Sequence, residues 1–289
     1  MTKMLLRCHK TLCSPRHLPW SLRLPITCQS SRRAHGTYGP ANSSNTEHRR
    51  DPGLLERTWI AVSSAFGAMA DPTRQETVAY LGEATGPYFL ARARDKMLVH
   101  PVGRRILRER PVINTTTLDL DRLRGLPDGT FGREYVRFLD TEHVSPDTRV
   151  PVKFIGNTEL AYVMQRYREV HDFWHTLTGL PTTIEAEIGL KWLEFVQSGF
   201  PVAMLSAFVG PLRLTSTERE VLFSHYVPWA VQCGSSCQFL LNIYYEEHMH
   251  RPLDELRKEL GFIPLPSIAD SVTSGYSEAA KEGQTTQIN

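Results

Sequence analysis

Apolar residues recur every three or four positions along most of the chain between Leu54 and Leu260, which is the period of an α-helix with one buried face. A strand-like pattern is confined to about Val150–Ile155. Segments rich in Pro, Asp and Gly, at about 111–130 and 141–151, interrupt the helical pattern and predict loops. The pattern therefore predicts a mainly α protein, folded as a compact multi-helix single domain with short wrapping loops.

Local signals place several helix ends. Asp71-Pro72 predicts a helix start, because Asp is a favoured N-cap and Pro a favoured first helical residue. Gly86-Pro87 predicts the end of the segment that follows. Further helices are expected at about 88–97, 103–110, 132–139 and 215–225.

One helix is predicted with clear limits, from Thr158 to Thr178. Its apolar positions continue through His171 and His175, so both imidazoles are expected on the inward stripe. Gly179-Leu180-Pro181 is a typical helix stop. Thr182-Thr183-Ile184-Glu185 resembles a capping box, with Thr182 as the cap of a second helix. The two helices are therefore expected to meet at a tight corner.

Four side chains near this corner can bind a metal ion: His171, Asp172, His175 and Glu187. Residues four apart share a face of a helix, so His171 and His175 can offer two imidazoles to one ion. Asp172 borders that face, and Glu187 lies about one turn into the second helix. The spacing predicts a metal site at the helix–helix corner.

The same residues also have ordinary interpretations. A histidine on an apolar face is often a satisfied core residue. Asp172 could pair with Arg168 and Glu187 with Lys191, as exposed bridges worth about 0.3 to 0.5 kcal/mol. Glu185 competes with Glu187 as a ligand, although its position three after Thr182 suits a helix cap. Spacing alone leaves these alternatives open.

Charge separates the N-terminal segment from the rest of the chain. The 289-residue chain has a formal charge of +2, yet residues 1–46 carry seven Lys or Arg and no Asp or Glu. This composition, with its Ser and Leu, predicts a mitochondrial transit peptide and leader. The alternative is a basic arm that binds nucleic acid. The remainder has no basic patch that would support such an arm, so no nucleic-acid partner is expected.

The remaining composition sets the domain limits and leaves one apolar segment open. Residues 47–266 are predicted to form the helical domain, and the polar residues 267–289 a disordered tail. Cys233 and Cys237, four apart in a helical pattern, are expected to be small core residues. Phe200–Leu214 is too short to span a bilayer, which needs about 20 apolar residues. It is interpreted as a core helix, or as a wall for a long apolar ligand or a lipid-facing surface.

The motif His171-Asp172-x-x-His175-x11-Glu187 resembles the signature of the fourth Coq protein family of coenzyme Q (ubiquinone) biosynthesis. Other blocks agree with that family in consistent order, and the resemblance extends over about Leu54–Pro266. These blocks are Ala70–Arg74, Leu81–Gly86, Gly103–Leu107, Gly132–Tyr135, Ser145–Arg149 and Asp254–Leu260.

The resemblance implies a peripheral protein on the matrix face of the mitochondrial inner membrane, within a multisubunit complex of coenzyme Q biosynthesis proteins. It also implies Zn²⁺ at His171, Asp172, His175 and Glu187. The implied activity is that of a carbon–carbon lyase, a decarboxylase that removes the C1 carboxyl of a 4-hydroxy-3-methoxy-5-polyprenylbenzoate to give a 2-methoxy-6-polyprenylphenol. A lipid-binding scaffold without catalysis and an oxidative decarboxylation are the alternatives.

The chemistry of the four residues leaves two further points open. Two histidines with carboxylates suit zinc but equally accept Fe²⁺ or Mn²⁺. Since a catalytic metal keeps one position open for substrate, Asp172 is expected to act as a proton donor or as a ligand that swings aside. No Rossmann or P-loop pattern indicates a nucleotide cofactor.

Two other metal enzymes fit the residues less well. An HD-type phosphohydrolase would need a further histidine upstream, for which His143 is the nearby candidate. A carboxylate-bridged di-iron protein would need two Glu-x-x-His helices, and Glu247-x-x-His250 supplies one.

Overall fold

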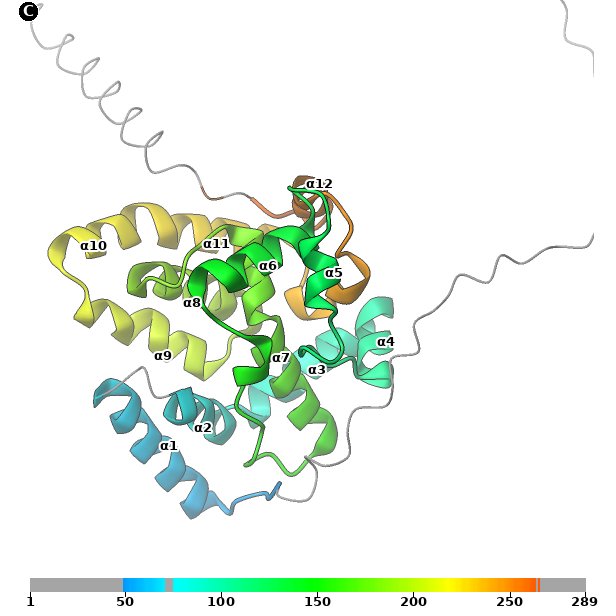
Figure 1. Cartoon of the computed structure of the whole chain (residues 1–289). Helices are drawn as coiled ribbons and strands as arrows, with labels where there is room; N and C mark the ends of the chain where they lie inside the picture. Colours follow the sequence, from blue (N-terminus) through cyan, green and yellow to red (C-terminus); the bar gives the residue numbers. More distant parts are fainter. Residues whose placement is uncertain (1–48, 71–74, 264, 266–289) are drawn as a thin grey trace, which may run out of the picture. The chain divides into compact units, whose positions relative to one another are not determined.

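The computed structural model describes residues 49–70, 75–263 and 265, all of which belong to the unit Tyr38–Asn289. The predicted transit peptide, the helix start at Asp71-Pro72 and the polar tail lie outside these residues, so they stay predictions. The described chain is mainly α, as predicted, and its helices surround a common apolar core (Figure 1). The helices are α1 (Leu54–Ala70), α2 (Gln75–Thr85), α3 (Pro87–Val99), α4 (Pro101–Glu109), α5 (Leu120–Arg124), α6 (Phe131–Glu142), α7 (Thr158–Thr178), α8 (Ile184–Ser198), α9 (Pro201–Val209), α10 (Ser216–Val221), α11 (Val227–Ser236) and α12 (Leu253–Glu259).

No β-strand occurs in the described part of the chain, so the strand-like interpretation of Val150–Ile155 is wrong. The backbone amides of Lys153 and Phe154 donate hydrogen bonds of 2.8 and 2.6 Å to the buried Glu83 carboxylate on α2. A side chain thus satisfies the polar groups that a neighbouring strand would satisfy in a sheet. This segment wraps the helices as a loop.

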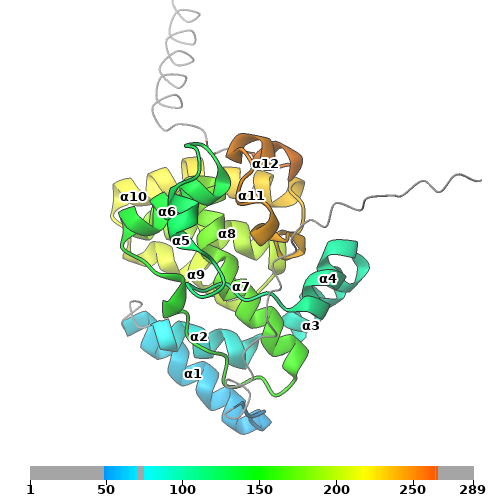
Figure 2. The same ribbon diagram turned by 45° about the vertical axis from the view of Figure 1, so that its right-hand side comes forward.

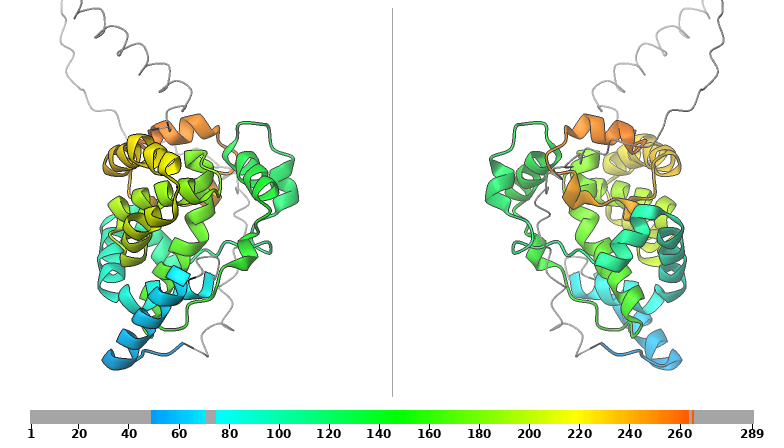
Figure 3. Two further views of the ribbon diagram at one scale, coloured as in Figure 1. Left: turned by 90° about the vertical axis from the view of Figure 1, so that its left-hand side faces the viewer. Right: turned by 90° about the vertical axis from the view of Figure 1, so that its right-hand side faces the viewer.

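Helix α7 is the central element, and its predicted limits are confirmed. The Asn157 side chain caps its first turn by accepting from two backbone amides, and Gly179 ends it in the left-handed conformation at φ 75°. The helix contacts α3, α4 and α6. Figure 3 shows α5 and α6 on one side of α7, and α9 to α11 on the other.

The burial of α7 is broader than the predicted inward stripe. From Ala161 to Thr178, all residues are buried except Gln165, Arg168 and His171. These three follow one another at intervals of three, so they form one partly open line along an otherwise enclosed helix. His171 lies on that line, whereas His175 lies one turn further along in the core.

The corner between α7 and α8 exists, but the predicted capping box does not. Thr183, not Thr182, is the residue before the first turn of α8, and its side chain caps no backbone amide. Its hydroxyl instead donates to Glu185 at 2.8 Å, while the Thr182 hydroxyl donates to Glu142 on α6. A distant partner therefore replaces the local cap.

Helices α1, α2 and α9 form one side of the fold, where α1 packs on α2 and α2 on α9 (Figure 2). In α9, Val202 and Ala203 are buried, but Phe208 is 57% exposed. Phe200–Leu214 is predicted as a core helix, or as a lipid-facing or ligand-facing surface. Its helix α9 has a buried face and an exposed apolar face. None of the described helices is long and apolar enough to cross a membrane.

The other predicted helices are confirmed with small shifts. The helix predicted at 132–139 is the longer α6, and the one predicted at 215–225 divides into α10 and the π-helical turn Leu222–Tyr226. Cys233 and Cys237 are buried free thiols, as expected for small core residues.

Candidate metal centre

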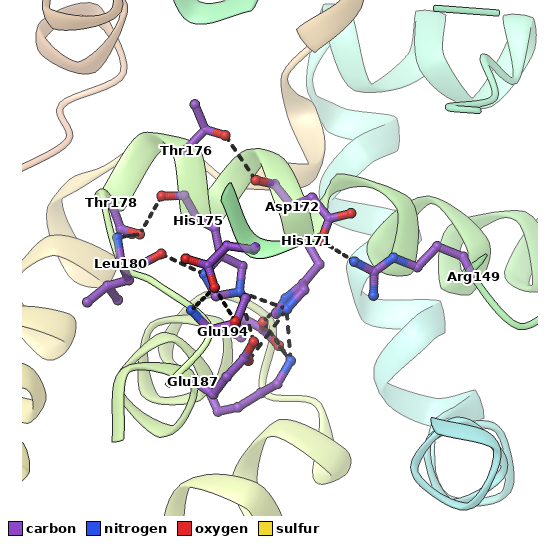
Figure 4. Close-up of polar contacts among 12 residues, drawn as sticks. Arg149, His171, Asp172, His175, Thr176, Thr178, Leu180, Glu187 and Glu194 are labelled. Carbon is purple, nitrogen blue, oxygen red and sulfur yellow. Dashed lines mark hydrogen bonds and ion pairs between the residues drawn. The ribbon is translucent and has the colours of Figure 1, made fainter. Parts of the chain in front are cut away.

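Three of the four predicted ligands meet at the corner between α7 and α8. The Nε2 atoms of His171 and His175 lie 3.2 Å apart. The Glu187 carboxylate faces both, with Oε1 3.1 Å from His175 Nε2 and Oε2 3.6 Å from His171 Nε2. Figure 4 shows the three side chains pointing toward one another. Within the described residues, His171, His175 and Glu187 form a group of side chains whose ligand atoms all lie within 4.8 Å of one another.

The Nδ1 atom of each imidazole, which faces away from the cluster, contacts another group of the protein. His171 Nδ1 lies 2.7 Å from Glu194 Oε1, and His175 Nδ1 lies 2.9 Å from the Leu180 carbonyl oxygen. The Phe138 ring also stacks on His175 at 5.0 Å. The nearest partner of each Nδ1 is an acceptor, while the donor Lys191 Nζ lies farther from His171 Nδ1, at 3.5 Å. Nδ1 is therefore assigned the hydrogen in each ring, and each Nε2 presents a lone pair.

Two lone pairs at 3.2 Å repel each other unless a positive charge lies between them. A proton on one ring supplies that charge, and so does a metal ion. Two nitrogens bound at about 2.0–2.1 Å to a tetrahedral zinc ion lie roughly 3.3 Å apart, close to the spacing here. The residues present therefore fit a divalent ion in both donor chemistry and spacing.

The charges around the cluster favour an ionised Glu187. Burial raises the pKa of this carboxyl, but its contacts with His171 and His175 outweigh burial and hold the pKa well below its usual range. Burial and Lys191 lower the pKa of His171, whereas Glu194 and Glu187 raise it, and the net pKa is above its ordinary value.

Glu194 is a further residue of the candidate site, and the sequence motif does not include it. It lies on α8 seven residues after Glu187, hence on the same helix face. Its buried carboxylate accepts from Lys191 Nζ at 2.8 and 2.9 Å and from the Tyr167 hydroxyl, besides holding His171. Histidine ligands of metals are commonly oriented by such a carboxylate. Glu194 therefore positions His171.

Asp172 is not brought into the cluster. Its buried carboxylate turns to Arg149, from the loop after α6, and forms an ion pair with the guanidinium Nη2 (Figure 4). Among the described residues, neither Asp172 Oδ2 nor Arg149 Nε has a hydrogen-bond partner, although both atoms are buried. The predicted ligand role of Asp172 would require it to leave Arg149.

The alternative pairings predicted for these residues are wrong. Arg168 pairs with Glu83 at 2.8 Å rather than with Asp172, and Lys191 pairs with Glu194 rather than with Glu187. Glu185 bonds its own helix start. The competing metal sites also fail within the described chain, because neither His143 nor the pair Glu247 and His250 belongs to a group of converging ligand atoms.

A cavity of about 300 Å³ opens beside the cluster. One part of its wall is polar and includes His171, Glu187, Lys191 and two arginines. The other part is apolar and comes from α2, α7 and α9: Val78, Ala79, Gly82, Met164 and Val202. Such a cavity suits a small ligand with one charged and one apolar side.

The match to a protein family covers this whole site. Residues 48–266 match the family described as coenzyme Q (ubiquinone) biosynthesis protein Coq4. The chain belongs to the Coq4 family. The family resemblance drawn from the motif is thereby confirmed.

Coq4 relatives match over most of the chain. The human protein named "Ubiquinone biosynthesis protein COQ4 homolog, mitochondrial" is 50% identical over 219 residues, covering 76% of this chain and 83% of that protein. The COQ4 protein of Laccaria bicolor, also named as mitochondrial, is 42% identical over 285 residues, covering 96% and 95%. A solved structure from Nostoc punctiforme, provisionally named as a ubiquinone biosynthesis protein, has a TM-score of 0.56 at 23% identity, over 74% of this chain and 97% of that one. This last likeness supports the helical fold alone.

Proposed function

We propose that this Coq4 protein acts in coenzyme Q biosynthesis as a metal-dependent decarboxylase of a 4-hydroxy-3-methoxy-5-polyprenylbenzoate. The bond between ring carbon C1 and the carboxyl carbon breaks, its electron pair stays on C1, and a proton replaces the released carbon dioxide. The convergence of His171, His175 and Glu187 on one point supports the proposal. A structural role alone would not require two opposed imidazole lone pairs beside a carboxylate.

In this proposal, His171, His175 and Glu187 hold the ion, which is Zn²⁺ or another divalent ion such as Fe²⁺ or Mn²⁺. When bound, the ion supplies Lewis-acid stabilisation of negative charge on the head group. Glu194 and the Leu180 carbonyl keep the imidazoles oriented. The predicted roles of Asp172 as a ligand and in proton transfer stay predictions, and turnover by Asp172→Asn tests the second of them.

The cavity suits the head group rather than the whole lipid. Its volume of about 300 Å³ is at the low end of small-molecule sites, so a long polyprenyl tail would have to leave it. The apolar wall from α2 and α9 gives the tail a direction away from the polar residues.

The proposed location is the mitochondrion, on the matrix face of the inner membrane, with other coenzyme Q biosynthesis proteins as partners. The mitochondrial names of the relatives support the compartment. On α1, Leu55, Trp59 and Phe66 are between 70% and 87% exposed and follow one another at helical intervals. Such a stripe suits a helix that lies on a lipid surface, as expected for a peripheral protein.

The decisive assay follows carbon dioxide from purified protein and a prenylated 4-hydroxy-3-methoxybenzoate. We expect turnover in the wild type and a loss of at least about 10²-fold in Glu187→Gln. Glu185→Gln is the matched control, since it changes the same residue type on the same helix turn outside the cluster. A phenol product supports simple decarboxylation, and a product with hydroxyl at C1 supports the oxidative alternative. Absence of turnover in metal-loaded protein would exclude the enzyme and leave the scaffold.

A further inference from the structure

Three cationic side chains line the cavity beside the candidate metal centre, and two of them donate several hydrogen bonds to the protein itself. Arg168 donates to the Val150 and Ala79 carbonyls and to Glu83, at 2.8 to 2.9 Å. Lys191 donates to both oxygens of Glu194. Both are therefore held by at least two hydrogen bonds to acceptors of the protein.

Arg149 differs from these two. Its side chain remains 23% exposed and lines the cavity. A guanidinium carries five N–H donors, yet Nη2 is the one nitrogen with a hydrogen-bond partner among the described residues. That partner, Asp172, is buried behind it and holds the group at the cavity wall. Since Nε is itself buried, the donors left for a ligand are on the two terminal nitrogens, and Arg149 is a fixed cation with unused donors at the cavity wall.

The balance of charge also favours an anionic ligand. Four carboxylates surround the cavity and the cluster: Glu83, Asp172, Glu187 and Glu194. Arg149, Arg168 and Lys191 oppose them. A divalent ion at the cluster would leave one positive charge in excess, which a monoanion would neutralise.

We propose that Arg149 anchors the carboxylate of an aromatic acid in this cavity, with Asp172 as the residue that positions it. The planar guanidinium fork matches a carboxylate better than a neutral amide. This inference rests on the proposed function for its choice of an aromatic acid, and it makes Arg149 the residue that distinguishes the acid from its decarboxylated product.

The test compares two small probes, 4-hydroxybenzoate and its neutral analogue 4-hydroxybenzamide, by ligand-observed NMR titration against the full-length protein. We expect the wild type to bind the acid at least about tenfold more tightly than the amide. Arg149→Gln should remove most of this preference while the metal content stays equal to that of the wild type. Arg124→Gln is the control, because Arg124 is an arginine paired with aspartates outside the cavity. It should leave the preference unchanged.

Arg149→Gln leaves the buried Asp172 without its partner, which could unfold the protein or itself repel the acid. The double variant Arg149→Gln with Asp172→Asn removes both effects and should also lose the preference. The titration is repeated after removal of metal with a chelator. A preference that survives in both variants, or that depends on metal and not on Arg149, would overturn the proposal. A preference that depends on Arg149 in a protein that releases no carbon dioxide would refute the proposed reaction and leave the anchor standing.

Discussion

Replacement of Glu194 by glutamine removes the buried charge beneath His171 at nearly constant volume. Burial raises the pKa of Glu194, but the charge of Lys191 and the contact with His171 lower it from the ordinary 4.5 to about 2. At about 1.4 kcal/mol for each tenfold change in proton affinity, ionised Glu194 stabilises the fold by roughly 3 kcal/mol.

The sign of the pH dependence follows from the lowered pKa. The stabilisation is fully present above the unfolded-state pKa of 4.5 and is lost as the pH falls toward about 2. Glutamine cannot ionise, so this contribution is absent from Glu194→Gln at every pH. We expect the variant to be roughly 3 kcal/mol less stable at neutral pH, and the gap to narrow by about 1.4 kcal/mol per pH unit below 4.5.

Urea denaturation curves at a series of pH values, from neutral to about pH 3, measure this gap. Glu220→Gln is the control, because Glu220 is an exposed glutamate on α10. It should follow the wild type throughout. If the difference in free energy of unfolding between wild type and Glu194→Gln stays constant down to about pH 3, the ionised carboxylate of Glu194 does not stabilise the fold.

The close packing at Gly103 and the exposed apolar face of α1 can each be tested by substitution. An added Cβ at Gly103 would clash with Asn242 Oδ1, so we expect Gly103→Ala to lower the free energy of unfolding, measured by denaturant titration, by about 1–3 kcal/mol. Gly53 is the control, because a Cβ there would meet no atom within 4 Å, and Gly53→Ala should leave the free energy of unfolding unchanged. The double variant Trp59→Ser with Phe66→Ser should bind vesicles containing anionic phospholipid at least about tenfold more weakly in a sedimentation assay, and equal binding would contradict a lipid-facing α1.

Much of α7 and the core of the site follow from local rules. The helix period, Asn157 before the first turn and Gly179 after the last fix the limits of α7. Because the period also fixes which residues share a face, the meeting of His171 and His175 could be predicted. Glu187 needed one more condition, the sharp corner at Gly179-Leu180-Pro181, which the sequence also indicates.

Other features depend on contacts between distant segments. Asp172 was expected near the imidazoles or paired with Arg168, but Arg149, 23 residues earlier in a loop, lies closer in the fold. Thr182 bonds Glu142, 40 residues away, and so the predicted capping box is lost. Glu194 differs from these cases. Its place seven residues after Glu187 could have been found from the helical period.

The central claim is that His171, His175 and Glu187 hold one divalent metal ion. Elemental analysis after equilibrium dialysis against Zn²⁺, Fe²⁺ or Mn²⁺ measures it directly. We predict one ion per chain in the wild type and in Glu185→Gln, and a loss of at least about tenfold in affinity in His175→Ala and Glu187→Ala. A wild type without stoichiometric metal, or equal metal in wild type and Glu187→Ala, would contradict the account.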